Sequence, residues 1–117
     1  MVTSDFQISQ EKTTQGLLVH ASGELYLDTA GELRDALFNV VSNGLYPRVI
    51  VDLREIGIMD SSGIAAILNA RKRTAEGLTE FRVLVALGSQ PHRVLAAAGL
   101  IPHLGVIFEL NVLTDCE

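Results

Sequence analysis

Residues 48–53 restrict the possible folds of this chain more than any other segment. They read Arg-Val-Ile-Val-Asp-Leu, which is β-branched and almost wholly apolar. A strand of this kind suits the centre of a sheet whose two faces are both covered, and such sheets are largely parallel. Because parallel neighbours are joined by crossovers that are usually helices, the segment predicts a chain that alternates strands and helices.

Four other segments have strand character and are bounded by turn-forming residues. The strand that precedes the first helix is expected to end at Ser22 and Gly23, and residues 24–28 are expected to form a loop. Residues 54–59 are expected to form a loop or a short turn after the central strand. The four predicted strands cover residues 6–8, 17–21, 81–87 and 106–108.

The first predicted helix has a start signal, an apolar stripe and a stop signal. Thr29 and Glu32 have the spacing of a capping box, in which two side chains satisfy the first free amides of a helix. The Asn-Gly pair at residues 43–44 suits a left-handed helix end. Between these signals, apolar residues recur at steps of three and four: Leu33, Ala36, Leu37, Val40 and Val41.

Two further helices follow the central strand. Residues 60–63, Asp-Ser-Ser-Gly, offer capping side chains for the second helix, which is expected to end at Gly77. Ser89 can cap the third helix, with Pro91 in its first turn and Gly99 as its left-handed stop. The last nine residues are too short to interpret.

These elements predict a single α/β domain over residues 1–117. Its sheet is expected to be small, mixed and mostly parallel, with about four to five strands. Hydrophobic residues make up 48% of the chain and aromatic residues only 5%, so we expect a core of aliphatic side chains. No linker, internal repeat or low-complexity segment divides the sequence.

Charge and hydropathy narrow the classes of partner. The formal net charge is −5, which argues against nucleic acid, because phosphate binding requires a basic face. No apolar run approaches the roughly 18 residues that a membrane helix needs, and the N-terminus has no secretory pattern. We therefore expect a cytoplasmic protein. The dense basic run Arg71-Lys72-Arg73 suits the last turns of a helix, with a docking patch for an acidic partner as the alternative.

Searches for motifs of cofactor or metal chemistry find none. There is no glycine pattern followed by Lys-Ser/Thr and no G-x-G-x-x-G after a strand, so no nucleotide cofactor is expected. His20, His92 and His103 have no carboxylate or cysteine at metal-ligand spacing, and each is interpreted as an ordinary polar residue. The single cysteine, Cys116, has no partner for an internal disulfide and is interpreted as functionally silent.

The sequence also lacks a complete catalytic set. Ser61 follows a predicted strand and precedes a helix, but it has no G-x-S-x-G motif around it. An acyl-transfer serine needs a general base and an orienting acid. His92 and Asp52 are conceivable in these roles, although nothing in the sequence directs them at Ser61. We therefore expect no enzymatic activity.

Residues 59–63, Met-Asp-Ser-Ser-Gly, allow two interpretations. The structural one is a helix cap, since Asp and Ser are good caps and Gly permits close packing. The functional one uses the same geometry, because the free amides and partial positive charge at a helix start can hold a phosphate. A phosphate on Ser61, beside Asp60, would create a strongly anionic tip and could change partner binding while the fold stays intact.

The chain resembles a STAS domain, and most closely the stand-alone bacterial anti-sigma factor antagonists. The resemblance runs from about residue 17 to about residue 108, most of the chain. It rests on five segments in register: Gly23-Glu24-Leu25, Asp28-Thr29-Ala30 with Glu32-Leu33, residues 49–53, residues 59–63, and Ala98-Gly99-Leu100.

This resemblance implies a fold, a switch and its partners. Helices would pack largely on one side of the sheet, and Ser61 would be the phosphorylated serine. The kinase would be an anti-sigma factor with a histidine-kinase-like ATP site, which binds the unphosphorylated antagonist and thereby frees a sigma factor. A phosphoserine phosphatase would reset the switch. The partner surface would include residues around the phosphosite and the loop before the first helix: Glu24, Tyr26, Asp28, Asp60, Ser62 and Gly63.

Two departures from the family and three other functions stay open at this point. Many members carry Asp where this chain has Tyr26, and the family usually ends in a further helix for which little sequence remains here. The alternatives are a scaffold subunit of a large signalling assembly, an accessory subunit of a membrane transporter, and a domain that binds nucleotide directly.

Overall fold

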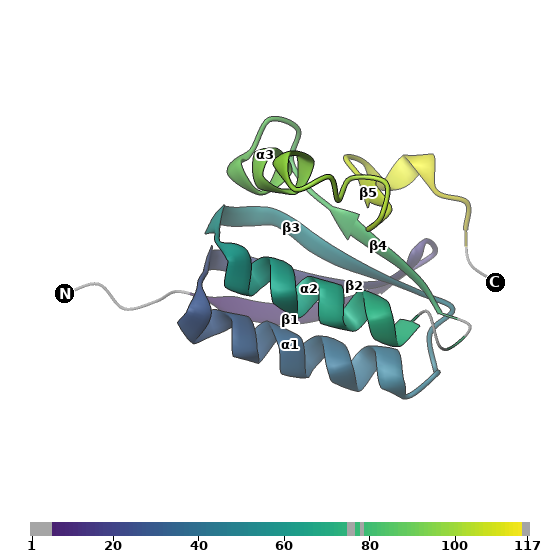
Figure 1. The fold of residues 1–117 in the computed structure, drawn as a ribbon. Helices are drawn as coiled ribbons and strands as arrows, with labels where there is room; N and C mark the ends of the chain where they lie inside the picture. The colour runs from purple at the N-terminus through teal and green to yellow at the C-terminus, as the bar shows by residue number, and fades with distance from the viewer. Residues whose placement is uncertain (1–5, 75–76, 78, 116–117) are drawn as a thin grey trace.

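A computed structural model describes residues 6–74, 77 and 79–115 of the chain. Figure 1 shows helices α1 and α2 running side by side across the sheet, with α3 at one edge. The C-terminal segment of the described chain ends in a short 3₁₀-helix, Leu110–Val112. The strands and helices, in chain order, are β1 (Gln7–Thr13), β2 (Gly16–Leu25), α1 (Leu27–Ser42), β3 (Arg48–Met59), α2 (Ser61–Thr74), β4 (Glu80–Leu84), α3 (Gln90–Ala97) and β5 (Val106–Ile107).

The five described strands form one sheet in the order β1-β2-β3-β4-β5. β1 pairs with β2 antiparallel, and the other three pairings are parallel. The expected mixed, mostly parallel sheet is confirmed. β3 lies in its centre, as its β-branched sequence predicts, and Val49, Ile50 and Val51 are fully buried.

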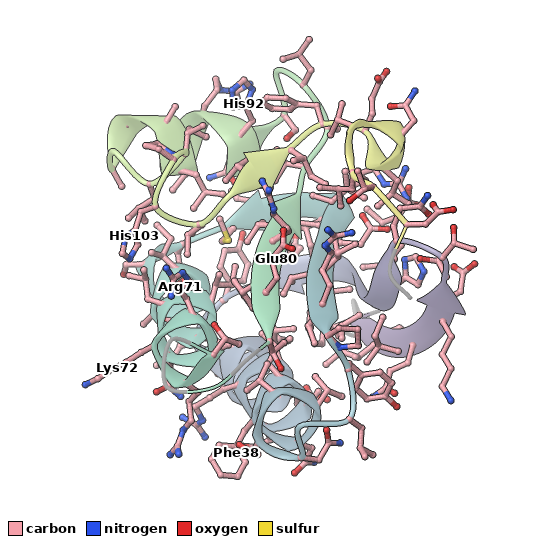
Figure 2. The ribbon with its side chains drawn as sticks, turned by 90° about the vertical axis from the view of Figure 1, so that its right-hand side faces the viewer. Phe38, Arg71, Lys72, Glu80, His92 and His103 are labelled. Atoms are coloured by element: carbon pink, nitrogen blue, oxygen red, sulfur yellow. The ribbon has the colours of Figure 1, made fainter. Side chains whose placement is uncertain are left out.

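The two faces of the sheet carry different cores. Val19 and Val51 belong to a large cluster that includes Leu33 of α1, Ile67 of α2 and Leu95 of α3. The alternate positions form a smaller cluster on the other face, against which residues of the C-terminal segment pack: Leu18, Ile50, Leu84 and Ile107, with Leu110 and Leu113 against them. Strand side chains alternate between faces, so all three helices lie on one side of the sheet. Figure 2 shows this arrangement from the edge.

The helix ends combine confirmed and corrected predictions. Ser89 caps α3 by accepting a hydrogen bond from the His92 amide, and Gly99 is left-handed, as predicted. α1 also ends beside a left-handed Gly44. The prediction that Thr29 caps α1 is wrong, because the helix begins two residues earlier, at Leu27.

Two strands extend further than predicted. Ser22 and Gly23 do not end β2, which continues to Leu25 and leaves no loop over residues 24–28. Residues 54–59 are likewise part of β3 and not a loop. Both extensions occur because β2 and β3 stay paired as far as Leu25 and Met59. The pairing contains two register shifts, and Gly23, next to one of them, has a φ of 106°.

The remaining differences are smaller. β4 ends at Leu84 and not at residue 87, and β5 comprises only two residues. α2 runs to Thr74. Residues 75 and 76 lie outside the described part of the chain, so the expected helix end at Gly77 stays a prediction. Cys116 lies outside the described residues.

Candidate functional site

The candidate site is the junction between β3 and α2. Asp60 closes this junction as a helix cap: its Oδ1 accepts a hydrogen bond from the Ser62 amide at 2.9 Å. Its carbonyl oxygen accepts hydrogen bonds from the amides of Gly63 and Ile64 at 3.1 and 3.3 Å. Ser61 is the first residue of α2, and its side chain is exposed. The predicted helix start is therefore confirmed, and the Ser61 hydroxyl lies where the positive end of the helix dipole is strongest.

Neighbouring elements hold the backbone of this junction on two sides. The Asp60 amide donates to the carbonyl oxygen of Leu25 at 3.2 Å, which ties the start of α2 to the end of β2. The side-chain amide of Gln90, at the start of α3, accepts a hydrogen bond from the Met59 amide at 2.8 Å. The same group donates to the Met59 carbonyl oxygen at 2.9 Å. The junction is thus fixed before any partner binds.

Gly63 allows α2 to approach the sheet closely. A Cβ atom at this position would lie 2.7 Å from Cγ of both Leu25 and Met59. Real Cβ atoms do not tolerate such a contact, so a side chain here would push the helix away. Gly63 is buried, and its contribution to a partner surface would come from this packing and not from direct contact.

The start of α1 lies beside the start of α2. Thr29 stabilises it from the third position of the helix: its Oγ1 accepts a hydrogen bond from the Tyr26 amide at 3.0 Å. The same hydroxyl donates to the carbonyl oxygen of Glu24 at 2.8 Å. This bond pattern replaces the predicted pair of Thr29 and Glu32. At this helix start, Tyr26 and Leu27 are exposed, with 38% and 77% of their surface accessible.

A cavity of about 400 Å³ lies between α1 and α2, next to the candidate site. It extends from Ser62 on α2 to Arg34 on α1. Small side chains on both helices line it, and this leaves the space between the helices open. Its lining residues are Leu27, Ala30, Gly31, Arg34, Ser62, Ala65 and Ala66. The cavity gives this end of the molecule a concave surface with an exposed leucine at its rim.

The structure brings the sequence-predicted site residues to one end of the sheet. Glu24, Tyr26 and Asp28 are exposed at the end of β2 and the start of α1, while Asp60 and Ser62 are half-buried at the start of α2. The carboxyl ends of parallel strands lie at the same edge of a sheet, which explains why segments about 35 residues apart meet here. Their assignment as partner contacts stays a prediction.

The groups considered for acyl transfer are engaged elsewhere. Nδ1 of His92 accepts a hydrogen bond from the Gly88 amide at 2.8 Å, and its ring packs edge-on against Phe108. Asp52 is buried in a different cluster, with His20 and Arg54. Neither side chain is directed at Ser61, so the structure forms no serine triad from these residues.

Sequence reasoning missed a polar network on the face of the sheet away from the helices. Nδ1 of His20 lies 2.7 Å from Oδ2 of Asp52, and Nε2 lies 2.8 Å from Oε1 of Glu11. The Arg54 side chain donates two hydrogen bonds to the Asp52 carboxylate, each 3.0 Å long. The network thus links three adjacent strands, and strand register brings its members together. His20 is therefore not an isolated polar residue.

The network shifts the pKa values of its members. Burial by itself lowers the pKa of His20, but the hydrogen bonds to Glu11 and Asp52 outweigh it and raise the pKa above its ordinary value. Burial opposes ionisation of Asp52, yet the hydrogen bonds from Arg54 and His20 hold its pKa below the ordinary value. The network thus favours a protonated imidazole between two carboxylates.

Two further properties of the described residues bear on membrane and metal binding. None of their helices combines the length and apolar character required to cross a membrane. They also contain no group of three or more histidine, cysteine or acidic side chains arranged to hold a metal ion.

Comparison with known proteins gives three informative relatives. An anti-sigma F factor antagonist of Paenibacillus polymyxa is 28% identical over 97% of both chains. A crystal structure of an anti-sigma factor antagonist from Mycobacterium paratuberculosis has a TM-score of 0.82 at 21% identity, covering 92% of this chain and 90% of that one. The phosphorylated form of SpoIIAA, a Bacillus cell fate determinant, has a TM-score of 0.63 at 21% identity, covering 92% and 95%.

The two solved structures establish a shared fold, which agrees with the five-stranded sheet and its one layer of helices. The family model described as STAS domain matches residues 7–112, which include all described strands and helices. This chain therefore belongs to the STAS domain family.

Proposed function

We propose that this chain is an anti-sigma factor antagonist whose binding to an anti-sigma factor is switched by phosphorylation of Ser61. Family membership and the similarity to the Paenibacillus antagonist over nearly the whole chain support the role. In this role the chain acts by binding and not by catalysis. It would work in the cytoplasm, as one STAS unit over residues 1–117.

The observation that carries the proposal is the exposure of Ser61 at the first position of α2. Its hydroxyl makes no hydrogen bond within the described part of the chain, so phosphorylation would break no existing interaction. The amides of Ser62 and Gly63, by contrast, are already bound to Asp60. A phosphate on Ser61 would therefore lie at the surface. It would be stabilised chiefly by the partial positive charge at the N-terminus of α2.

The charge of this phosphate explains how it would change binding. It carries about −1.5 to −2 charges near neutral pH. Asp60 is adjacent, and the exposed carboxylates of Glu24 and Asp28 belong to the same end of the sheet. A partner surface that buries this end would have to desolvate the added charge without a matching cation, which weakens the complex. The relative SpoIIAA has been solved in a phosphorylated form, so a fold of this kind accepts the modification in that protein.

The proposal assigns two enzymes to the switch. The kinase is the anti-sigma factor itself, with a histidine-kinase-like ATP site, and a phosphoserine phosphatase removes the phosphate. The concave surface between α1 and α2, with the exposed Leu27 at its rim, supports docking of a partner protein beside the serine.

Phosphorylation by the cognate anti-sigma factor tests the assignment of Ser61. The purified chain is incubated with ATP and that anti-sigma factor, and the modified residue is mapped by mass spectrometry. Ser62→Ala is a matched control, because Ser62 is the neighbouring serine and its hydroxyl also makes no hydrogen bond within the described residues. We expect Ser61→Ala to abolish labelling and Ser62→Ala to retain it. Labelling of the Ser61→Ala variant would refute the assignment.

Binding provides the second test. Unphosphorylated protein, fully phosphorylated protein and the Ser61→Asp variant are titrated against the same anti-sigma factor. We expect the variant to bind at least tenfold more weakly, since about 1.4 kcal/mol of unfavourable charge burial has this effect. Equal affinity of the fully phosphorylated protein would contradict the switch.

A further inference from the structure

The two edges of the sheet differ in length and regularity. At one edge, β5 is only two residues long. At the other edge, β1 is a strand of seven residues, Gln7–Thr13, whose pairing with β2 has no shift in register. Figure 2 shows the purple N-terminal hairpin at a border of the molecule. A long, regular edge strand without proline can bind a further strand through its backbone, whereas a very short one offers too few groups.

The outer edge of β1 is accessible. Five of its seven residues are exposed, and the other two, Ile8 and Thr13, are half-buried. Among the described strands, β2 is its only neighbour. Within the same part of the chain, no loop or helix end forms a backbone hydrogen bond to β1. The edge therefore carries backbone groups that a further strand can reach.

The hairpin between β1 and β2 determines which backbone groups face outward. Its loop is two residues long, because Thr13 pairs with Gly16. Residues that close such a loop form a hydrogen-bonded pair, and bonded pairs alternate with non-bonded pairs along antiparallel strands. The odd-numbered residues of β1 therefore bond to β2. The residues that direct their N–H and C=O away from β2 are Ile8, Gln10 and Lys12.

The two charged side chains of β1 do not block this edge. Oε1 of Glu11 lies 2.8 Å from Nε2 of His20, on the face of the sheet without helices. Nζ of Lys12 lies 6.0 Å from the ring centroid of Tyr46, which packs against the helix-side core. Charged side chains protect edge strands when they oppose an approaching strand. Here both are directed over the two faces of the chain's own sheet.

β1 is complementary to a second copy of itself. If two copies pair antiparallel about a two-fold axis through Gln10, the midpoint of the strand, all seven residues pair and the outward-facing residues meet each other. Ser9 then lies opposite Glu11 of the second copy and can donate a hydrogen bond to its carboxylate, while Ile8 lies opposite the aliphatic part of Lys12. An axis through Glu11 would place two carboxylates opposite each other, and one through Ser9 would leave the end of each strand unpaired.

We propose that β1 binds a second copy of this chain, in a two-fold dimer whose two sheets join at Gln10. The contact comprises one pair of short strands, which is smaller than a permanent interface, so we expect a dissociation constant between about 10 μM and 1 mM. Because the two β1 strands are antiparallel, the two copies of Ser61 lie at opposite ends of the joined sheet and both stay exposed. The dimer thus presents two separate ends to partner proteins.

Sedimentation equilibrium of the unphosphorylated protein, from about 10 μM to 1 mM at about 0.15 M salt, tests the dimer. Gln10→Pro removes an outward-facing N–H that forms no bond to β2, and edge strands tolerate proline at such positions. We expect it to weaken dimerisation at least tenfold. Gln10→Thr is the matched control, because it keeps the N–H, and we expect less than a threefold change. A protein that stays monomeric throughout, or equal dimerisation of Gln10→Pro, would overturn the proposal.

Charge substitutions on the helix-free face test the register, and they do not depend on how proline affects folding. Ser9→Glu places a carboxylate opposite Glu11 of the second copy at two symmetry-related positions, so it should weaken dimerisation at least threefold, whereas Ser9→Lys should strengthen it. Gln7→Glu makes the same charge change on the same strand and face, but opposite Thr13, and we expect less than a twofold effect. Equal losses in Ser9→Glu and Gln7→Glu would overturn the proposed pairing.

Amide hydrogen exchange identifies the surface that the dimer uses. In dilute protein, the amides of Ile8, Gln10 and Lys12 should exchange quickly, whereas those of Ser9 and Glu11 should be protected by their bonds to β2. At the highest protein concentration, exchange of the three outward-facing amides should slow at least twofold. Slowing at another element instead would assign the dimer to a different surface and overturn the proposal. None of the variants changes α2, so these outcomes are independent of the proposed switch at Ser61.

Discussion

The polar residues at the start of α2 and those on the helix-free face of the sheet are arranged in opposite ways. At the start of α2 the Ser61 hydroxyl is exposed and unbonded within the described residues, although the backbone around it is fixed. On the helix-free face, Asp52 is buried and bonded to both His20 and Arg54. Asp52 lies in β3 and Ser61 begins the helix that follows it, only nine residues further along the chain.

The difference separates two uses of polar side chains. Groups whose hydrogen bonds are satisfied inside the fold contribute to stability, and removing one leaves its partners unpaired. Groups left free on a fixed backbone contribute little to stability and are available for modification or binding. If bonded and free polar side chains differ in this way, substitutions should change the free energy of unfolding most at Asp52 and least at Ser61.

Asp52→Ala should cause the largest loss of stability, about 3 kcal/mol. The substitution removes the buried carboxylate to which His20 and Arg54 are bonded, and removing one partner of a buried charge pair costs about 3–5 kcal/mol. His20 and Arg54 are partly exposed, which places the expected value at the lower end. Urea unfolding at pH 7 measures it. A loss below about 1 kcal/mol would show that the network is not a stabilising element.

Gly63→Ala should cost about 2 kcal/mol. Its new methyl group would lie 2.7 Å from side-chain atoms of Leu25 and Met59, and overpacking of this kind costs about 1–3 kcal/mol. Gly31→Ala on α1 is a suitable control, because its nearest contact would be 3.6 Å, from the Arg34 side chain. In the control, the better helix propensity of alanine should stabilise the protein slightly. Thermal unfolding of both variants distinguishes packing from propensity.

The pH dependence of stability should reveal the histidine network. The pKa of His20 is raised in the folded state, so its contribution is complete below its ordinary value of 6.5 and is lost as pH rises through the folded value. The pKa of Asp52 is lowered, so its contribution is present above 3.8 and is lost as pH falls. We expect maximal stability between these limits.

Urea unfolding from pH 5 to pH 9 measures this profile, and His20→Gln provides the comparison. Glutamine retains hydrogen-bonding capacity but does not titrate, so the decline above pH 6.5 should flatten in the variant. The groups that face His20 are Glu11 and Asp52, and Arg54 lies behind Asp52. An unchanged decline in His20→Gln would assign the pH dependence to other residues.

Variants at Ser61 should change stability least. Ser61→Ala is expected within about 0.5 kcal/mol of the parent, as for surface positions without bonded partners. Ser61→Asp should be neutral or slightly stabilising, because a negative charge at a helix start gains about 0.3–1 kcal/mol. A loss of more than about 1 kcal/mol in either variant would mean that the serine is part of the fold, which would remove the contrast between the two clusters.

The sequence predicted the elements that local patterns define. The β-branched run at residues 48–53 identified the central strand, and Ser89 with Pro91 identified the start of α3. The extension of β3 to Met59 could not be predicted in the same way. Residues 54–59 include exposed polar groups and Gly57, and they are held in the sheet by pairing with β2 through shifts in register. That pairing is a tertiary effect, which outweighs local propensity.

The candidate sites differ for the same reason. Ser61 could be located from capping residues that are adjacent in sequence. The network of His20 could not, because Glu11 and Asp52 lie 9 and 32 residues away and only strand register brings them together.

The backbone anchors at Met59 and Asp60 determine how the proposed switch can convey its state. Gln90 and Leu25 hold this turn from opposite sides, so the added phosphate has no loose segment to reorder. In the proposed switch, the phosphorylation state would therefore be conveyed by surface charge alone, without a conformational change inside the chain. Its response time would then be the turnover time of the proposed kinase and phosphatase.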